Sequence, residues 1–359
     1  MKIGIVGGGF AGLSAAIAFR HHGHGVTVYE KTAEPPAGGG AISLAQNALT
    51  CLEMLGVRER ISTTRWADTP ASVRSANGKV LVHSTLPKLT GGTEYATVPR
   101  SQLLRWLTEQ LPADSVQYST SVTGVDPDGS VQISDNVRKF DLVVGADGPN
   151  GIVRSTLWPS GPAARLINTT NWAWFVDKDL REGFGTIWGR TAQFGVLPLN
   201  DGRTYVYGGA SRHDIELSAF RDWPAPLPEL INAARPEHII RPRILEARPP
   251  RQLTRGHVVL IGDAAHTMQP TFGQGAALAM EDALTLACQG TQALSRRRRR
   301  MLALYAMSKA GAYFATPQNA FLEIARNTAL HLTPGPVFNR MAGTASRWQP
   351  PKDLQTKIL

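Results

Sequence analysis

Residues 3–19, IGIVGGGFAGLSAAIAF, place a short apolar run, a glycine cluster and an alanine-rich segment in direct succession. The apolar run is typical of a strand buried in a parallel sheet, and the alanine-rich segment has the composition of a helix. Gly7, Gly9 and Gly12 have the G-x-G-x-x-G spacing, which permits a tight turn, a close approach to a pyrophosphate and close helix–strand packing. The helix N-terminus adds N–H groups that attract phosphate. The stretch therefore predicts a Rossmann-type dinucleotide site.

The next predicted strand, VTVYE, ends on an acid, Glu30. A carboxylate about 20 residues beyond the glycine motif can accept a hydrogen bond from a free ribose hydroxyl, and it repels a 2′-phosphate. FAD or NAD is therefore favoured over NADP here. The alternative, a tight strand–helix turn without a ligand, is less favoured because strand, glycines, helix, strand and acid occur in the required order.

Two further apolar runs end on glycine and aspartate. LVV precedes Gly145 and Asp147, and VVLI precedes Gly262 and Asp263. Ligands of parallel sheets bind outside the carboxyl ends of the strands, so these strand ends indicate one shared site. For Asp147 alone, a turn-forming aspartate remains the alternative.

The last of these runs continues into GDAAHTMQPTFGQGAALAMEDA, residues 262–283, where a proline and two glycines precede a predicted helix that begins near Ala276. Asp263 could accept hydrogen bonds from a polyol, while the helix N-terminus faces a ring that gains negative charge. A reduced isoalloxazine is such a ring. Gly273 and Gly275 would let backbone N–H groups approach it.

Composition narrows the class of protein. The chain has 359 residues, of which 42% are hydrophobic, and two isolated cysteines, Cys51 and Cys288. A folded cytoplasmic protein without disulfides or a metal site is expected, and no apolar stretch reaches the roughly 20 residues of a membrane span. The net charge of +10 and the run Arg296–Arg300 raise the question of an acidic partner. We expect a solvated helix face and no nucleic-acid binding, because the run lacks interleaved aromatic residues.

The residue pattern changes between residues 167 and 251, where aromatic residues alternate with polar ones between glycine-rich turns. This pattern predicts antiparallel sheet, and Asn77–Gly78 predicts an additional hairpin. We therefore expect an α/β protein in which a parallel-sheet domain is interwoven with a mostly antiparallel one. The predicted boundaries are 1–70, 98–166 and 252–290 for the first domain and 71–97 and 167–251 for the second. Residues 291–359 are expected to be helical as far as 333–336, with an irregular tail.

Three motifs together resemble the signatures of the class A flavoprotein monooxygenases, the 4-hydroxybenzoate hydroxylase family. They are GGGFAG with Glu30, GADGPNGIVR at residues 145–154, and residues 262–283. Their order is the same as in the family, and the resemblance covers most of the chain. Residues 38–56, GGGAISLAQNALTCLEMLG, also resemble the segment near the flavin in urate, salicylate and 3-hydroxybenzoate hydroxylases.

The resemblance implies that FAD places its pyrophosphate over Gly9–Gly12 and its ribose on Glu30. It further implies Arg100 near the phosphates and Asp263 on the ribityl chain. The complete cofactor-binding set that we predict is Gly7, Gly9, Phe10, Ala11, Gly12, Glu30, Lys31, Ser43, Arg100, Val122, Asp147, Arg154, Asp263, Gly273, Gln274, Gly275 and Ala276. Two departures concern Gly151, where the family usually has Ser, and Gln46, where it usually has Pro. The first bears on how the Asp147 loop is held.

The same resemblance implies a reaction. In the family, NADH or NADPH reduces FAD transiently, O2 adds at carbon 4a, and the resulting hydroperoxide hydroxylates an aromatic or heteroaromatic small molecule. Only one dinucleotide motif is present, so the nicotinamide has no domain of its own. We assign Pro270 and Gly273 to the catalytic set beside the flavin, and His213 and Tyr207 as candidates to deprotonate or orient a phenol. His266 is expected to have a packing or hydrogen-bonding role, and the oligomeric state is expected to be a monomer or homodimer.

Two alternatives stay open at this point. A flavin-dependent halogenase or epoxidase has the same fold, and NWAWFVD at residues 171–177 resembles the halogenase Trp-x-Trp motif without the Ile-Pro that follows it. A non-catalytic flavin-binding redox protein would need no substrate pocket.

Overall fold

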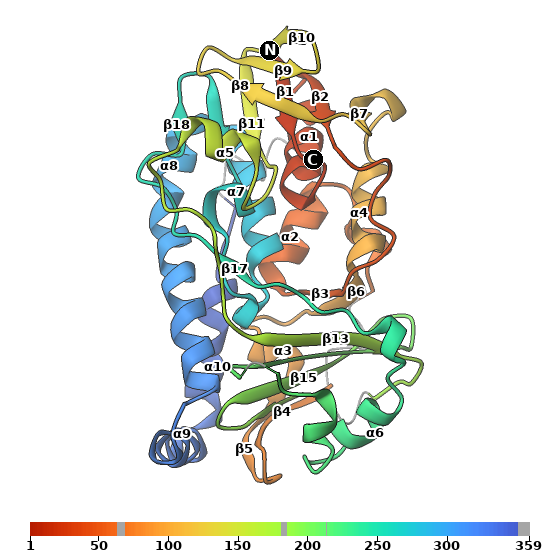
Figure 1. Ribbon diagram of the computed structural model, residues 1–359, viewed down its shortest axis with the longest axis vertical. Helices are drawn as coiled ribbons and strands as arrows, with labels where there is room; N and C mark the ends of the chain where they lie inside the picture. Colours follow the sequence, from red (N-terminus) through yellow and green to blue (C-terminus); the bar gives the residue numbers. More distant parts are fainter. Residues whose placement is uncertain (63–68, 181–184, 213, 351–359) are drawn as a thin grey trace.

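The computed structural model describes residues 1–62, 69–180, 185–212 and 214–350. Two sheets lie one above the other, and long helices run along one side of both (Figure 1). The upper sheet contains the N-terminal strand, and the lower one contains the aromatic segment. The predicted α/β class with a parallel sheet is confirmed.

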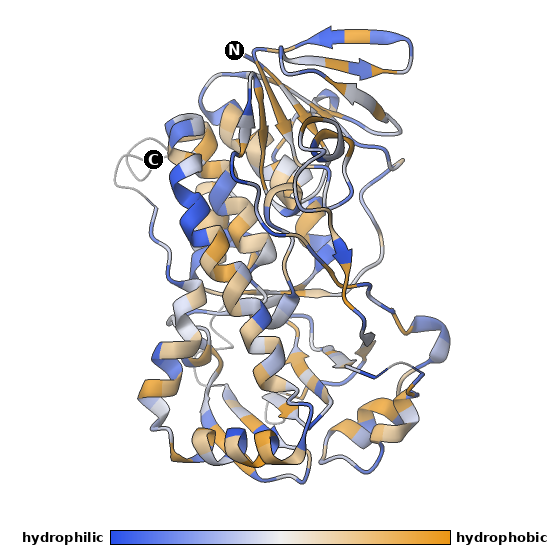
Figure 2. Cartoon of the chain, turned by 60° about the vertical axis from the view of Figure 1, so that its left-hand side comes forward, coloured by the Kyte–Doolittle hydropathy of each residue, from blue (hydrophilic) through white to orange (hydrophobic). Residues whose placement is uncertain are grey.

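The upper sheet has the strand order β18–β19–β11–β1–β2–β7. Adjacent strands are parallel except β18, which is antiparallel to β19. The strands are β1 Lys2–Val6, β2 Gly25–Tyr29, β7 Val116–Gln117, β11 Leu142–Gly145, β18 Thr254–Arg255 and β19 Val258–Leu260. Their apolar runs are coloured hydrophobic in Figure 2, and most of these side chains are buried in the main core. The three strand ends of the sequence motifs, on β1, β11 and β19, therefore lie side by side.

Helices pack around this sheet, and α1 packs against the first half of α8. The helices are α1 Phe10–His21, α2 Gln46–Met54, α4 Arg100–Thr108, α5 Ile152–Leu157 and α7 Asp263–His266. Smaller sheets join the two regions and cover the top: β3 Ala41–Leu44 with β6 Ala96–Pro99, β8 Val122–Val125 with β9 Ser130–Ile133 and β10 Asn136–Lys139, and β12 Arg165–Leu166 with β17 Leu245–Glu246.

The lower sheet has the order β13–β16–β15–β14–β4–β5, and only β14 and β4 pair in parallel. Its strands are β4 Pro70–Ser75, β5 Val80–Thr85, β13 Thr170–Val176, β14 Gly185–Trp188, β15 Ala192–Pro198 and β16 Thr204–Ala210, with α3 Leu86–Leu89 and α6 Leu227–Asn232 beside them. The hairpin predicted at Asn77–Gly78 is confirmed by the β4–β5 pairing. Alternation separates the aromatic residues: Trp172 and Trp174 pack with Phe194 in one cluster, while Tyr205 belongs to another.

The long helix α8, Gly275–Ala315, is two helices joined at Gly290, whose backbone has φ 77°. Glycine adopts this left-handed conformation without the penalty that a Cβ brings. Beyond it the second half returns alongside the first, because Arg297 and Arg300 contact Glu281. The expectation of a solvated arginine run was therefore wrong for these two arginines, whereas Arg296 and Arg299 are exposed.

The C-terminal region also differs from the expectation of an irregular tail. After α9, Ala320–Leu332, the chain forms α10, Gly335–Ala342, and a short 3-10 turn over Gly343–Ser346. Pro336 lies in the first turn of α10, where its missing N–H costs nothing. No helix in the described part of the chain is long and apolar enough to cross a membrane.

Candidate active site

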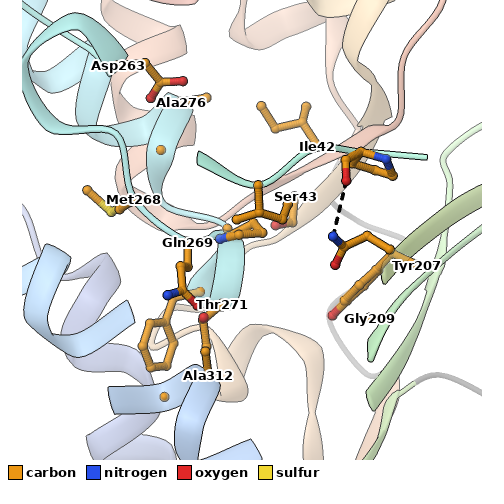
Figure 3. Close-up of a pocket in the computed structure, with 18 of the residues that line it drawn as sticks. Ile42, Ser43, Tyr207, Gly209, Asp263, Met268, Gln269, Thr271, Ala276 and Ala312 are labelled. Carbon is orange, nitrogen blue, oxygen red and sulfur yellow. Dashed lines mark hydrogen bonds between the residues drawn. The ribbon is translucent and has the colours of Figure 1, made fainter. Parts of the chain in front are cut away.

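A cavity of about 1580 Å³ extends from the carboxyl ends of the upper strands to the lower sheet. Single ligands usually occupy about 300–1,000 Å³, so this space has room for two molecules. Figure 3 shows Asp263 and Ala276 at one side of it and Tyr207 and Gly209 across from them. The loops after β1, β2, β11 and β19 thus contribute to one cavity, as the sequence predicts.

The glycine loop forms the upper wall. Gly7 has φ 107°, and a Cβ there would overlap the Ala146 backbone, so glycine is required. A Cβ on Gly9 would meet nothing within 4 Å, which leaves open space in front of its backbone. Glu30 accepts hydrogen bonds from the N–H of Gly8 at 2.7 Å and of Thr32 at 2.9 Å. The carboxylate is thereby fixed beside the loop, at the edge where a ribose would follow a pyrophosphate.

Asp147 shows how the departure at Gly151 is accommodated. Its carboxyl group occupies the space that a Cβ at position 151 would fill, and its Oδ2 accepts from the Val153 N–H of α5 at 2.9 Å. Its Oδ1 is buried and has no hydrogen-bond partner among the described residues. Burial raises the pKa of Asp147 to about 6, although the Val153 N–H opposes the shift. An unpartnered buried oxygen that lines a cavity fits a ligand with a hydrogen-bonding group there.

The opening of α8 forms the opposite side. Its N-cap is Gln274, no side chain caps its first turn, and Ala276 lines the cavity. Arg100 lies at this end with its guanidinium 4.6 Å from the centre of the Phe10 ring. Burial lowers the pKa of Arg100, and the neighbouring charge of Asp263 opposes that shift. The uncapped helix N-terminus that lines the cavity and the open backbone at Gly9 together fit a phosphate-bearing cofactor with an anionic reduced ring.

The structure brings most of the predicted residues together. The members of the predicted sets that line the cavity are Gly7, Gly9, Phe10, Ala11, Glu30, Lys31, Ser43, Arg100, Val122, Asp147, Tyr207, Asp263, Pro270, Gly273, Gly275 and Ala276. His213 lies outside the described residues. Gly12 does not line the cavity: a Cβ there would overlap the Gly7 carbonyl oxygen, in agreement with its expected packing function.

Arg154 and Gln274 are not among the residues that line the cavity, so the cofactor contacts expected of them stay predictions. Arg154 donates hydrogen bonds to the carbonyls of Ala264, Pro162 and Arg248 at 2.8, 2.7 and 3.1 Å. It therefore ties the segment after Asp263 to the rest of the fold. The Gln274 side chain is buried, its Oε1 accepts from Asn47 at 2.9 Å, and its Nε2 donates to the Ser346 hydroxyl at 3.3 Å.

Asn47 and Gln274 belong to a buried polar network beside the N-terminus of α8, which the sequence did not predict. We call the part of the cavity lined by the Gly7–Gly9 loop, Glu30, Asp147, Asp263 and the first turn of α8 the cofactor end. Glu281 accepts from Asn47 at 2.7 Å, from Arg297 at 2.7 Å and from Arg300 at 2.8 Å. The neighbouring Asp282 pairs with Arg297 at 3.0 Å and with His266 at 2.7 Å. Burial alone would raise the pKa of Asp282, yet His266 and Arg297 hold it below its usual value. The packing or hydrogen-bonding role expected of His266 agrees with this geometry.

Tyrosines dominate the sheet side of the cavity. The Tyr207 ring covers Gly195, where a Cβ would overlap it, and the Tyr205 hydroxyl lies over Gly40 in the same way. Burial raises the pKa of Tyr207 to about 12, so its phenol stays protonated at neutral pH. Tyr207 can therefore donate a hydrogen bond to a ligand, and the structure does not favour it as a base. Tyr95, which sequence reasoning missed, is buried and also lines the cavity.

The comparisons with known proteins agree with this geometry. The sequence matches the family described as FAD binding domain over residues 1–311. It is 32% identical to aurachin C monooxygenase/isomerase of Stigmatella aurantiaca over 79% of each chain. It is 31% identical to FAD-dependent urate hydroxylase of Klebsiella pneumoniae over 80% of each chain. The structure of Klebsiella pneumoniae HpxO complexed with FAD and uric acid is similar at a TM-score of 0.84, with 26% identity and 96% of each chain covered.

Fold and site thus define a flavoprotein with a Rossmann-type FAD domain. The chain belongs to the FAD binding domain family, and within it to the class A flavoprotein hydroxylases, which are FAD-dependent monooxygenases. The resemblance inferred from the motifs is confirmed, as is FAD as the cofactor.

Proposed function

We propose that this protein consumes NADH or NADPH and hydroxylates a small aromatic or heteroaromatic molecule. The observation that carries the proposal is the single cavity, in which the segment Pro270–Gly275 and the Tyr207 side of the lower sheet line the same space. Bound FAD would supply the redox chemistry by accepting a hydride from the nicotinamide and activating O2 at its C4a atom. The names of the urate hydroxylase and aurachin C relatives support this class of substrate.

The protein's own residues would bind, orient and exclude water. The backbone of Gly9 and the carboxylate of Glu30 would hold the pyrophosphate and ribose, and Asp263 would accept hydrogen bonds from the ribityl hydroxyls. Pro270 and Gly273 would form the wall beside the isoalloxazine. The protonated Tyr207 would donate a hydrogen bond that orients the substrate ring.

We further propose that the two units of the fold divide these tasks. Residues 1–70, 98–166 and 252–290 would bind the cofactor, and residues 71–97 and 167–251 would bind the substrate. The pairing of β4 with β14 supports this division, because it joins the two substrate segments in one sheet.

A halogenase function is less well supported. Trp172 and Trp174 pack with Phe194 in the core cluster of the lower sheet, and Trp174 Nε1 donates to the Leu230 carbonyl at 3.0 Å. The Trp174 indole is thus used in packing, whereas Trp172 also lines the cavity and its Nε1 has no hydrogen-bond partner among the described residues.

The test is to supply FAD-loaded protein with NADH or NADPH and a panel of phenols, quinolones and hydroxylated N-heterocycles. We expect at least one ligand to stimulate NAD(P)H consumption and to gain one oxygen atom by mass. Assays with chloride present serve as the halogenation control. Consumption unaffected by every ligand, with all electrons recovered as H2O2, would contradict the proposal.

A further inference from the structure

Charged side chains in the cavity lining are confined to its cofactor end. Among the described residues, the charged lining residues are Glu30, Lys31, Arg100, Asp147 and Asp263. Four of them follow strands of the upper sheet, and Arg100 begins α4. The described residues that line the rest of the cavity, from the lower sheet and the C-terminal helices, include no Asp, Glu, Lys, Arg or His.

Basic groups close to this uncharged part have other partners. Lys309 pairs with Glu246 at 3.2 Å, and Arg165 pairs with the same carboxylate at 2.5 Å. Arg326 is buried behind Trp188 and donates to the Ala315 carbonyl at 2.6 Å. An anionic ligand in this part of the cavity would lose hydration without gaining a counter-ion from the described lining residues, which is costly.

The far end of the cavity is predominantly apolar. Its large lining side chains are Val73, Trp188, Phe314, Leu330, Phe338 and Met341, from β4, β14, the second half of α8, α9 and α10, and the smaller Ser72, Thr186, Thr316 and Thr333 lie in or directly after the same elements. Tyr207 on β16 and Ala312 on α8, both labelled in Figure 3, also line the cavity. A ring held near the flavin would therefore face hydrogen-bonding groups, while a substituent that extends away from it would enter the apolar end.

The same part of the cavity offers no described side chain that would deprotonate a substrate at neutral pH. Burial raises the pKa of both Tyr205 and Tyr207 to about 12. The described lining of this part therefore fits a ring that is already electron-rich and needs no deprotonation.

We propose that the substrate is an uncharged aromatic or heteroaromatic ring that carries an apolar arm, with the ring beside Tyr207 and the arm among Phe314, Leu330 and Phe338. The inference rests on the proposed function for the reaction but not for the binding. It separates this protein from hydroxylases of small aromatic anions.

The binding test uses FAD-loaded oxidised protein without NAD(P)H, so that no turnover occurs. The probes are 2-methyl-4(1H)-quinolone and 2-heptyl-4(1H)-quinolone, with salicylate and urate as anionic comparators, and calorimetry or the flavin absorbance reports Kd. Each methylene of the substrate arm that leaves water tightens binding about fourfold, and part of this gain is lost because the arm becomes ordered. We expect the heptyl compound to bind at least about 30-fold more tightly than the methyl compound and than either anion.

Variants at Phe338 and Ala312 test where the apolar arm of the substrate binds. Phe338→Glu should weaken the heptyl compound at least about tenfold, because it places a charge in the apolar end, and should leave the methyl compound unchanged. Phe338→Leu is the matched control and should retain the preference. Ala312→Phe, which places a phenyl ring in the cavity lining, should reduce the preference for the heptyl compound. This variant keeps the test usable if the Phe338 variants do not fold.

The outcomes separate this inference from the proposed function. Equal Kd values for the two quinolones, or tighter binding of salicylate or urate, would overturn the substrate class. A heptyl preference without oxygen insertion under turnover would support the substrate class and count against the proposed function. Oxygen insertion into salicylate or urate alone would support the proposed function and count against the substrate class.

Discussion

The two ends of the cavity are built in different ways. The cofactor end consists of the segments that follow β1, β2, β11 and β19 together with the start of α4. It presents backbone groups and five charged side chains, four from these segments and Arg100 from α4. The substrate end combines β14–β16 with the second half of α8, α9 and α10, and its described residues are uncharged. A cofactor site of this kind depends on short stretches whose spacing is visible in the sequence. A substrate site depends on which distant segments pack together, and for that reason the cofactor was easier to infer than the substrate.

The largest expected effect concerns the charges behind the cofactor end. Arg297→Met should destabilise the protein by about 3–5 kcal/mol, because it leaves Glu281 and Asp282 buried with fewer partners. Arg296→Met and Arg299→Met are matched controls on exposed positions and should stay within about 0.5 kcal/mol of the wild type. Urea unfolding at a fixed FAD concentration measures all three. Equal stabilities would show that the arginine run is a solvated face after all.

Sequence reasoning failed where a residue's environment comes from a distant segment. The arginine run was assigned to solvent because its partners become neighbours only through the reversal at Gly290. The helix α10 was missed because Gly335 and Pro336 were interpreted as a stop signal, although proline is tolerated in a first helical turn. The orientation of Tyr207 depends on the space left by Gly195 on the neighbouring strand. By contrast, the strand ends and their glycines were predicted correctly, because each motif is contiguous.

The next effect tests the burial of Asp147 at the cofactor end. Its pKa of about 6 lies above the value of 3.8 for a free aspartate, so the folded protein binds this proton more tightly than the unfolded chain. The FAD-free wild type should therefore lose about 2–3 kcal/mol between pH 4 and pH 7 relative to Asp147→Asn. Denaturant unfolding across this range measures the difference. A difference in unfolding free energy between wild type and Asp147→Asn that stays constant with pH, or changes in the opposite direction, would contradict the burial of Asp147.

Two glycine variants, Gly9→Ala and Gly12→Ala, distinguish a glycine that leaves room for the cofactor from one that is required for helix–strand packing. Gly9→Ala should leave the FAD-free protein as stable as the wild type, because a Cβ there meets open space. It should weaken FAD binding about 10- to 100-fold, which corresponds to an overpacking cost of about 1–3 kcal/mol. Gly12→Ala should instead destabilise the FAD-free protein, because its Cβ overlaps the Gly7 carbonyl. Unchanged FAD affinity in Gly9→Ala would place the pyrophosphate elsewhere.

The smallest expected effect is a change in the flavin midpoint potential, which tests whether the N-terminus of α8 stabilises the reduced cofactor. Ala276 lies in its first turn, which contains no acidic residue, and lines the cavity. If this turn faces the flavin, its partial positive charge stabilises the anionic reduced ring by about 0.3–2 kcal/mol. Ala276→Asp should cancel that stabilisation and lower the two-electron midpoint potential by about 10–40 mV.

Ala276→Asn is the matched control, since it has nearly the same shape as the aspartate but no charge. The measurement is a redox titration of each variant on the FAD-bound fraction, at low and at high salt. Because the cavity end is partly closed to solvent, the difference between the Asp and Asn variants should persist when salt screens exposed charges. Equal potentials for the two variants with FAD normally bound would mean that this helix does not point at the flavin. The uncapped first turn of α8 would then need another explanation, and the cofactor end would owe its affinity to the glycine loop and its strand-end carboxylates alone.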